Sequence, residues 1–273
     1  MAVQSVGIVT DKGIKGIRMA MEVGLSLGRQ EKDVSKLNKS KCMDFSNNLV
    51  ASKEELEYIS QLLNYTEGEN LPYYDESEDM EQWKAKLPHW EQYGKIQYVT
   101  FRLSDSLPQS CLNNIKIKKE SFELSHPRPW DEKTERKYSS LLKKWEDEYL
   151  DAGFGSCVLK TDSVRKILVD SLEFHNLKKY ILLAYVVMPN HVHALMLMRN
   201  NNKVSNVLNN IKRFSAKEIN KILNRHGSIW SPTWDRIVRS RQHLKHCVAY
   251  IKENPRYLPK ERFQIGGYLI KGY

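Results

Sequence analysis

Apolar and polar positions change their period repeatedly after residue 95, and strands are the first elements that this pattern predicts. Residues Ile96 to Leu103 alternate and are rich in β-branched and aromatic side chains, which is typical of a strand. Tyr180 to Met188 is mostly apolar, and a tight turn at Pro189-Asn190 leads into a second run, His191 to Met198. Because so short a turn joins antiparallel neighbours, these two runs predict paired strands. Arg236 to Arg239 predicts a further short strand.

Apolar positions three and four apart predict the helices that separate these strands. Four segments share this spacing: Lys133 to Leu150, Thr161 or Asp162 to Phe174, Val204 to Leu223, and Gln242 to Asn254. Gly227 and Pro255 are expected to close the last two, because glycine adopts the left-handed conformation and proline cannot continue a helix. The order strand, helix, strand, strand, helix, strand, helix predicts an α+β fold: a ferredoxin-like antiparallel sheet with flanking helices and one added helix.

The first third of the chain has fewer clear patterns. Ser52 and Glu55 form a capping-box pattern that predicts a helix from Lys53 to Asn64, and the acidic run from Tyr74 to Glu81 predicts an exposed linker. Two earlier patterns predict a short strand and a helix, over Val6 to Thr10 and Met19 to Leu27. Composition changes near Trp90 to Gly94. We therefore expect an N-terminal extension of unknown role over residues 1–87, a main domain over 88–262 and a C-terminal tail over 263–273.

The formal net charge of +10 is divided unevenly along the chain. Residues 1–94 hold 11 Lys plus Arg against 16 Asp plus Glu, whereas residues 95–273 hold 32 against 17. From Arg199 to Tyr273 the count is 16 basic against 4 acidic residues. This density favours a polyanion as partner, because neutralising phosphates releases counterions. The alternative is a basic surface that serves only solubility.

The remaining composition excludes several classes of protein. Four cysteines, Cys42, Cys111, Cys157 and Cys247, are widely separated, which indicates reduced thiols rather than a disulfide framework or a zinc finger. No run approaches the roughly 20 apolar residues of a membrane-spanning helix, and Met1 to Gly28 lacks a signal-peptide pattern. We therefore expect a cytoplasmic protein with no membrane partner.

Two histidines in the predicted strand after the Pro189-Asn190 turn are the first candidates for chemistry. Because alternate side chains of a strand share a face, His191 and His193 project the same way, as two ligands of one metal ion do. His-x-His is a short motif, so two ordinary strand histidines are an open alternative.

The last predicted helix holds the second candidate group. Tyr250 and Asn254 lie one turn apart on one face, beside an apolar stripe of Leu244, Val248 and Ile251. A phenol becomes a nucleophile when a nearby cation favours phenolate, and an amide oxygen suits a hard divalent ion. A packing role for Tyr250 and a helix-end role for Asn254 remain alternatives.

These motifs carry a family resemblance. The stretch YVVMPNHVHALM from Tyr185 to Met196, together with LKHCVAYIKENP from Leu244 to Pro255, resembles the single-tyrosine HUH transposases, most closely the REP-associated tyrosine transposases. The likeness extends to YVTFRLSDSLP from Tyr98, GFGSCVLK from Gly153 and IWSPTWDRIVRS from Ile229. It covers residues 88–260, so the expected main domain would be the catalytic one.

The resemblance implies a metal-dependent enzyme that nicks single-stranded or hairpin DNA and transfers the strand. His191 and His193 match the histidine pair that binds the metal, Asn254 matches the polar residue that completes the site, and Tyr250 matches the nucleophile. The implied ion is Mg or Mn, and the implied intermediate is a 5′-phosphotyrosine beside a free 3′-hydroxyl. The sequence does not distinguish a monomer from a homodimer.

Basic and aromatic residues near these motifs are the expected DNA contacts, since cations track phosphates and indoles stack on unpaired bases. They are Lys212, Arg213, Lys217, Arg236, Arg239, Arg241, Lys245, Trp230 and Trp234. For the two tryptophans a core position is an equal alternative.

Two departures from the family pattern are visible. Ser231 stands where the family commonly has glutamine, and residues 1–87 have no counterpart in its compact members. The extension can cover the basic surface, add a partner interface or be a fused segment. Two other functions remain open: a domesticated DNA-binding regulator without catalysis, and a metal phosphodiesterase that uses water.

Overall fold

The computed structural model describes residues 51–62, 72–79, 81–84 and 88–271. The chain divides into two units, Met1–Asp44 and Phe45–Tyr273, and the described residues all belong to the second. The strand and the helix predicted over Val6 to Thr10 and Met19 to Leu27 lie outside them.

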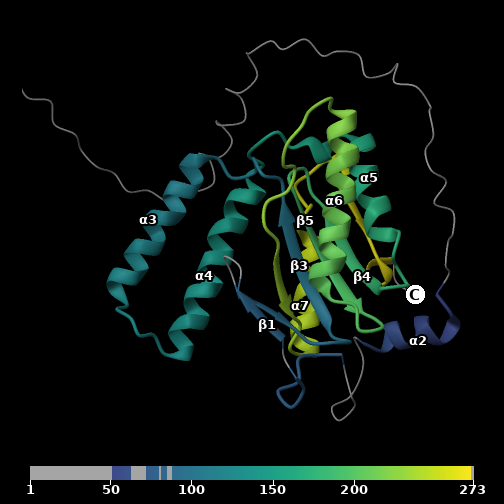
Figure 1. The fold of residues 1–273 in the computed structure, drawn as a ribbon, viewed down its shortest axis with the longest axis horizontal. Coiled ribbons are helices and arrows are strands. Elements are labelled where there is room, and N and C mark those ends of the chain that lie inside the picture. Colours follow the sequence, from purple (N-terminus) through teal and green to yellow (C-terminus); the bar gives the residue numbers. More distant parts are fainter. Residues whose placement is uncertain (1–50, 63–71, 80, 85–87, 272–273) are drawn as a thin grey trace, which may run out of the picture. The chain divides into compact units, whose positions relative to one another are not determined.

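A five-stranded antiparallel sheet forms the framework of the described part (Figure 1). Its strands are, in order across the sheet, β6 (Trp234–Ile237), β3 (Ile96–Arg102), β5 (His191–Met198), β4 (Tyr180–Val187) and β7 (Gln264–Gly266). The four predicted strands are all present, with β3 and β5 adjacent and β6 and β4 on either side of them. The last one begins two residues earlier than predicted, at Trp234 instead of Arg236, and ends at Ile237. This is the ferredoxin-like arrangement, so the predicted α+β class is confirmed.

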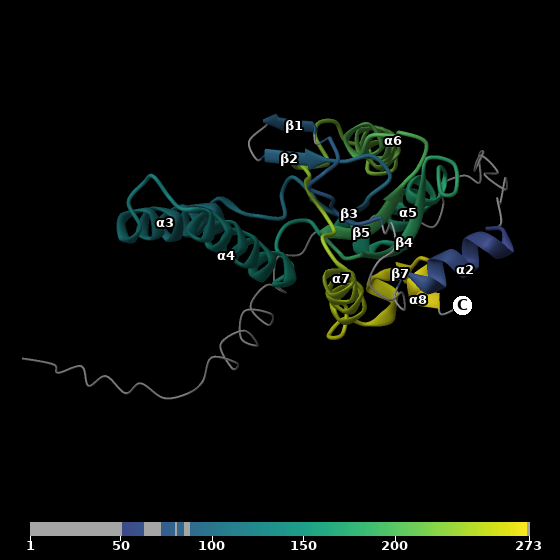
Figure 2. The same ribbon diagram turned by 90° about the horizontal axis from the view of Figure 1, so that it is seen from below.

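Helices cover both faces of the sheet, as Figure 2 shows. On one face, α5 (Asp162–Glu173) and α6 (Val204–Ile222) pack over a core that includes Phe101 and Val192. On the other face lies α7 (Arg241–Glu253), whose stripe of Leu244, Val248 and Ile251 is buried as predicted. The sheet is therefore a middle layer, and its three central strands, β3, β5 and β4, each supply side chains to two separate cores.

A helical hairpin lies beside the sheet, made of α3 (Gln109–Ser125) and α4 (Glu132–Asp151). The structure confirms the helix predicted from Lys133, with Asp131 capping it by accepting a hydrogen bond from the Thr134 N–H. The sequence did not predict α3. Its apolar side chains do not form a one-sided stripe, since Ile115 is buried whereas Ile117 and Leu124 are exposed.

Elements from both ends of the described chain pack on the α7 face of the sheet. The helix α2 (Lys53–Gln61) begins with the predicted capping box between Ser52 and Glu55, and its Ile59 and Leu62 join the same core as α7. The strand β7 pairs with β4, and α8 (Tyr268–Lys271) follows it. Pairing of Gln264–Gly266 was not predicted, because a three-residue strand is too short to show a period.

The acidic run is only in part the exposed linker that its charge predicts. Residues 76–79 are exposed, but the Tyr74 N–H donates to Val238 O over 3.0 Å, and Glu78 forms an ion pair with the buried Lys95. The hairpin of β1 (Glu81–Lys84) and β2 (Pro88–Glu91) follows. None of the helices in the described part of the chain is long and apolar enough to span a membrane.

Candidate active site at the His-x-His strand

His191 and His193 lie at the start of β5 and project from the sheet face that α7 covers. Their side chains are fully buried, with 1% and 0% of their surface exposed, and the ring centroids are 4.8 Å apart. Leu195 and Leu197 continue the same face of β5, whereas Val192 and its alternates face the α5–α6 core. The alternation predicted from sequence is therefore present.

Asn190 determines how the ring of His191 presents its nitrogens. The Asn190 amide group donates to Leu150 O and Phe154 O, each over 3.1 Å, so its Oδ1 is the acceptor that lies 2.7 Å from His191 Nδ1. Nδ1 must then carry the proton, and the buried Nε2 carries the lone pair. This is the tautomer that a metal ligand requires.

His193 is oriented from the neighbouring strand. Thr100 lies directly opposite it in the β3–β5 register, with Oγ1 2.9 Å from His193 Nδ1, and the Tyr98 hydroxyl is 3.0 Å from the same nitrogen. Hydroxyl groups accept as well as donate, so an Nδ1–H can donate to either oxygen. Nε2 of His193 is again the buried nitrogen on the far side of the ring.

The helix α7 brings Tyr250 to the histidines. Ser240 caps the helix by accepting a hydrogen bond from the His243 N–H, and its apolar stripe anchors it to the sheet. The half-buried ring of Tyr250 then lies 5.1 Å from that of His193, nearly perpendicular to it. Asn254 ends the helix, with its N–H donating to Tyr250 O. The strand with the two histidines and the helix with Tyr250 are therefore in contact, as the two sequence motifs suggested.

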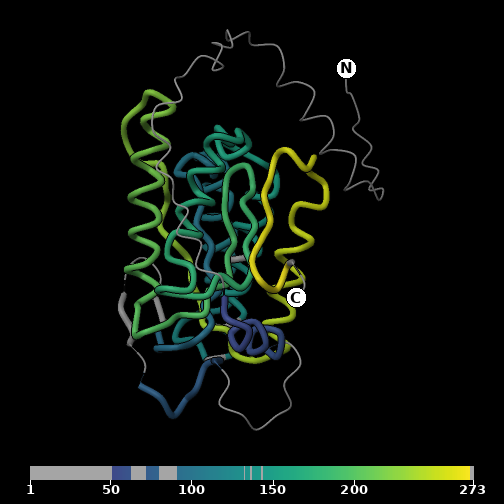
Figure 3. Tube along the Cα trace, turned by 90° about the vertical axis from the view of Figure 1, so that its right-hand side faces the viewer, coloured from purple at the N-terminus to yellow at the C-terminus, as the bar shows by residue number. Residues whose placement is uncertain are grey.

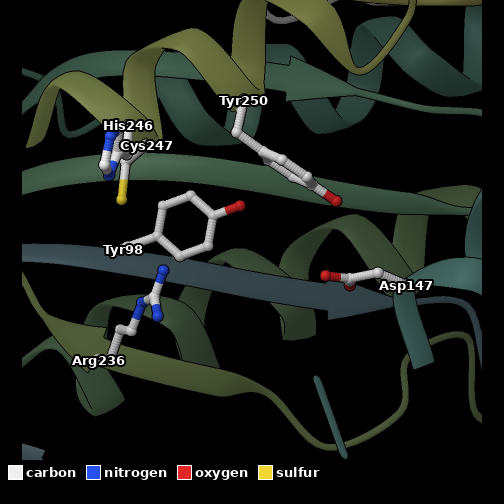
Figure 4. Close-up of a pocket in the computed structure, with 6 residues that line it drawn as sticks. All are labelled: Tyr98, Asp147, Arg236, His246, Cys247 and Tyr250. Carbon is white, nitrogen blue, oxygen red and sulfur yellow. The ribbon is translucent and has the colours of Figure 1, made fainter. Parts of the chain in front are cut away.

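A small cavity opens beside Tyr250. Its volume is about 200 Å³, and Figure 4 shows the six side chains that line it: Tyr98, Asp147, Arg236, His246, Cys247 and Tyr250. Asp147 reaches it from α4, Arg236 from β6, and His246 and Cys247 from α7. The cavity therefore combines a carboxylate, a guanidinium and a phenol.

The electrostatic surroundings of Tyr250 keep its hydroxyl protonated in the isolated protein. Burial is the main cause of a raised pKa of Tyr250, and the carboxylates of Asp147 and Asp151 raise this pKa further. The amide of Asn254 acts in the opposite direction and lowers the pKa. A positive charge or a proton acceptor is thus needed before the phenol can act as a nucleophile.

The donor atoms at this site fit a divalent metal ion. Asn254 Oδ1 is buried and has no hydrogen-bond partner among the described residues, and both histidine Nε2 atoms are buried. Two imidazoles and an amide oxygen are an acceptable set for Mg or Mn, with positions left for substrate oxygens. No group of three His, Cys, Asp or Glu side chains suited to a metal occurs in residues 51–62, 72–79, 81–84 and 88–271, and the third donor of the expected set is an amide.

The expected DNA contacts are distributed over several surfaces. Arg236 lines the cavity, with its guanidinium 5.4 Å from the Tyr98 ring centroid and 5.2 Å from that of Trp234. Three others are exposed, and one is partly exposed at the start of α7: Arg213, Lys217, Lys245 and Arg241. Arg239 is exposed with its guanidinium 5.9 Å from the Tyr74 ring centroid.

The polar atoms of two of the expected contacts bind other parts of the protein. Trp230 is 8% exposed, packs edge-on against Phe101 and donates its indole N–H to Ser215 Oγ over 3.0 Å, which corresponds to the core alternative. Lys212 donates to Ser231 O and Thr233 Oγ1, and burial lowers its pKa to about 8. Its ammonium group connects α6 to the segment before β6.

Sequence reasoning missed Asp147, Asn190, Tyr98 and Thr100 as members of the site. Tyr98 and Thr100 could have been found from the sequence. They are two positions apart in a predicted strand, so they share one face, and both lie in the stretch YVTFRLSDSLP. Asn190 was assigned only to the turn. No local signal identifies Asp147, since α4 carries many acidic residues.

The fold and the site together define an α+β protein in which a His-x-His strand faces a tyrosine-bearing helix. In a comparison with known families, residues 158–254 match the family described as "Transposase IS200 like". The matched segment contains both histidines, Tyr250 and Asn254, and it confirms the resemblance to single-tyrosine transposases.

The chain was also compared with solved structures and with curated proteins. The solved structure titled "Structure of the REP associates tyrosine transposase bound to a REP hairpin" shares 15% identity, with 63% of this chain and 73% of that chain covered and a TM-score of 0.35. No curated protein matches the chain.

Proposed function

We propose that the protein nicks single-stranded or hairpin DNA in a metal-dependent reaction and transfers the strand through a covalent link to Tyr250. The observation that carries this proposal is the position of the Tyr250 ring, 5.1 Å from the ring of His193. A nucleophile candidate on one helix and a metal-type pair on one strand are thereby within reach of a single phosphate.

The chain's own residues have distinct roles in this reaction. Tyr250 Oη attacks the scissile phosphorus while the bond to the 3′-oxygen breaks, so the products are a 5′-phosphotyrosine and a 3′-hydroxyl. His191, His193 and Asn254 would hold the divalent ion, with Asn190 and Thr100 fixing the two rings. When bound, Mg or Mn supplies positive charge that offsets the charge developing on the phosphate.

Joining of DNA is the reverse of this step. The phosphotyrosine keeps the energy of the cleaved phosphodiester, so a 3′-hydroxyl of a second strand can attack it and release Tyr250. Because α7 is anchored by buried Leu244, Val248 and Ile251, the tyrosine stays in position between the two steps.

Positive charge around the site supports DNA as the partner. Arg236 lines the cavity, Arg239 and Lys245 are exposed just before and on α7, and Arg213 and Lys217 are exposed on α6, which covers the opposite face of the sheet. Such cations supply affinity for phosphates without reading sequence, and Trp234 beside Arg236 offers an aromatic face for an unpaired base. Trp230 and Lys212 are left out of the proposed interface because their polar atoms bind other parts of the protein.

The experiment that tests the function is a covalent-trapping assay. The full chain is incubated with Mn²⁺ and a pool of end-labelled oligonucleotides, each with a hairpin stem and randomised single-stranded flanks, and is run on a denaturing gel. We expect wild-type protein to shift label into a covalent band and Tyr250→Phe to abolish that band while retaining DNA binding.

Tyr257→Phe is the matched control, because Tyr257 is 84% exposed and lies just beyond α7. It should form the adduct at the wild-type rate. A covalent band from Tyr250→Phe contradicts the assignment of the nucleophile. Cleavage without a covalent band indicates a water-using phosphodiesterase, and binding without cleavage indicates a DNA-binding regulator.

A further inference from the structure

We propose that Asp147, supplied by the α3–α4 hairpin, is a catalytic residue that accepts the proton of the Tyr250 hydroxyl during attack on DNA. The inference rests on the proposed function, since it requires Tyr250 as nucleophile. It assigns a role to a hairpin that lies outside the segment matched by the family, residues 158–254.

The geometry of the cavity is the first support. Asp147 and Tyr250 line the same cavity of about 200 Å³. Figure 4 shows the hydroxyl end of Tyr250 turned toward the Asp147 carboxylate and away from His246 and Cys247. A proton acceptor must lie within hydrogen-bonding reach or one water away, and apo sites are often looser than loaded ones.

The position of Asp147 is held by hydrogen bonds between the end of α4 and Asn190, in the turn before the histidine strand. One turn after it, Leu150 is 3% exposed and its carbonyl accepts from the side chain of Asn190. The Phe154 carbonyl, just beyond the helix, accepts from the same amide. Asn190 thus fixes both the His191 ring and the end of α4, so the carboxylate and the metal-type pair share one anchor.

The other side chains that line the cavity are poorer acceptors, and Asp151, a second carboxylate that raises the pKa of Tyr250, is not among them. Arg236 is a cation without a lone pair to offer, and His191 and His193 are assigned to the metal in the proposed function. His246 lies on the opposite side of the cavity in Figure 4.

Proton transfer to Asp147 accompanies the attack of Tyr250 on phosphorus. The Tyr250 O–H bond breaks as its oxygen bonds to phosphorus, and the proton moves to Asp147. The 3′-oxygen leaves and takes a proton from water. In the joining direction, protonated Asp147 returns its proton to the departing Tyr250 oxygen, so both directions depend on this carboxylate.

The test measures the rate of adduct formation with the full chain in excess over the same oligonucleotide pool and Mn²⁺. General base catalysis typically contributes about 10²–10⁴-fold, so Asp147→Asn should form the adduct at least about 100-fold more slowly while binding the pool as wild type does. Glu148→Gln is the matched control: it removes one negative charge next along α4 from a side chain that is 52% exposed and paired with Lys118. Its rate should equal that of wild type.

A second variant protects the test against a folding defect. Asp147→Ala is assayed with and without added formate, a small carboxylate that can enter the cavity. A rate that rises with formate supports the assignment, because a misfolded protein gains nothing from it, and an unchanged rate overturns it.

Two outcomes separate the base from the function it serves. An Asp147→Asn rate within a few fold of wild type, with Tyr250→Phe inactive, overturns the role of Asp147 and leaves the nucleophile in place. An adduct formed by Tyr250→Phe overturns the proposed function itself.

Discussion

The two faces of strand β5 show how one short segment serves two purposes. On the α5–α6 face, Val192, Ala194, Met196 and Met198 are all apolar and all buried. On the α7 face, the first two positions are His191 and His193, and only the following ones are leucines. Figure 3 views the same sheet from its side, with the α6 and α7 segments on either side of it. The period of two therefore separates a purely structural face from one that carries polar chemistry.

The two faces of β5 differ in the free energy of burying their side chains. Burying apolar side chains contributes about 25 cal/mol per Å², whereas burying polar rings costs free energy unless each ring is hydrogen-bonded. On the α7 face, Asn190, Thr100 and Tyr98 provide these bonds. On the α7 face, hydrogen bonds thus offset the cost of burying the two histidine rings, whereas apolar burial on the opposite face stabilises the sheet.

The largest expected effect separates the two faces directly. His191→Ala should abolish adduct formation in the trapping assay, because one of the two proposed imidazole ligands is lost, yet it removes no apolar contact from the α5–α6 core. Met196→Ala, on the other face, should lower the free energy of unfolding by about 2–5 kcal/mol, since Met196 is fully buried. Below its melting transition, Met196→Ala should still form the adduct.

Both variants are measured by adduct yield and by urea denaturation. EDTA should reproduce the His191→Ala defect in wild-type protein, and adduct formation that persists in EDTA contradicts the metal role. Equal loss of stability in both variants contradicts the division between the faces.

A smaller effect is expected at Asn190, which supports the site without entering it. Replacing a residue that orients a metal ligand typically costs about 10–100-fold in metal affinity. Asn190→Ala should therefore raise the Mn²⁺ concentration needed for half-maximal adduct formation by this factor. Asn190→Asp keeps an acceptor for His191 Nδ1 but removes the donors to Leu150 and Phe154.

Asn190→Asp is accordingly expected to need less added Mn²⁺ than Asn190→Ala and to be less stable than wild type. If the two variants need equal Mn²⁺ concentrations, the hydrogen bond from His191 Nδ1 does not determine the metal affinity. Titration with Mn²⁺ and a thermal melt are sufficient to decide.

The smallest expected effect concerns pH and a histidine of α7. Burial lowers the pKa of His243 to about 4, with further lowering by Arg236, Arg239 and His246, and His243 Nδ1 accepts a hydrogen bond from the Arg239 N–H. Between pH 6.5 and pH 4 the unfolded chain binds a proton that the folded chain does not, so the free energy of unfolding should fall as pH falls through this range.

His243→Gln should flatten this dependence, because glutamine offers an acceptor without titrating in that range. The measurement is the urea midpoint at several pH values between 7 and 4 for both proteins. An unchanged slope in His243→Gln contradicts the assignment to His243.

Local patterns predicted most of the described fold and named the residues at the centre of the candidate site. The alternation at Ile96, the turn at Pro189-Asn190 and the stripe at Leu244 each reflect the burial of neighbouring side chains, so they are visible in sequence. The helix α3 was missed because apolar residues on its exposed side, Ile117 and Leu124, obscure the apolar period of its buried side. The division into extension, main domain and tail stays a prediction, although α2 and α8 pack on the same face of the sheet as α7 and β7 pairs with β4.

The sequence by itself determined which residues are available for chemistry and on which faces of their own elements they lie, because strand and helix periods act over a few residues. Only the tertiary structure decided that Tyr250 meets His193, that Trp230 belongs to the core, and that Asp147 from a distant helix enters the cavity. Such meetings depend on how helices and strands pack across the sheet, and packing joins residues whose separation along the chain leaves no local pattern.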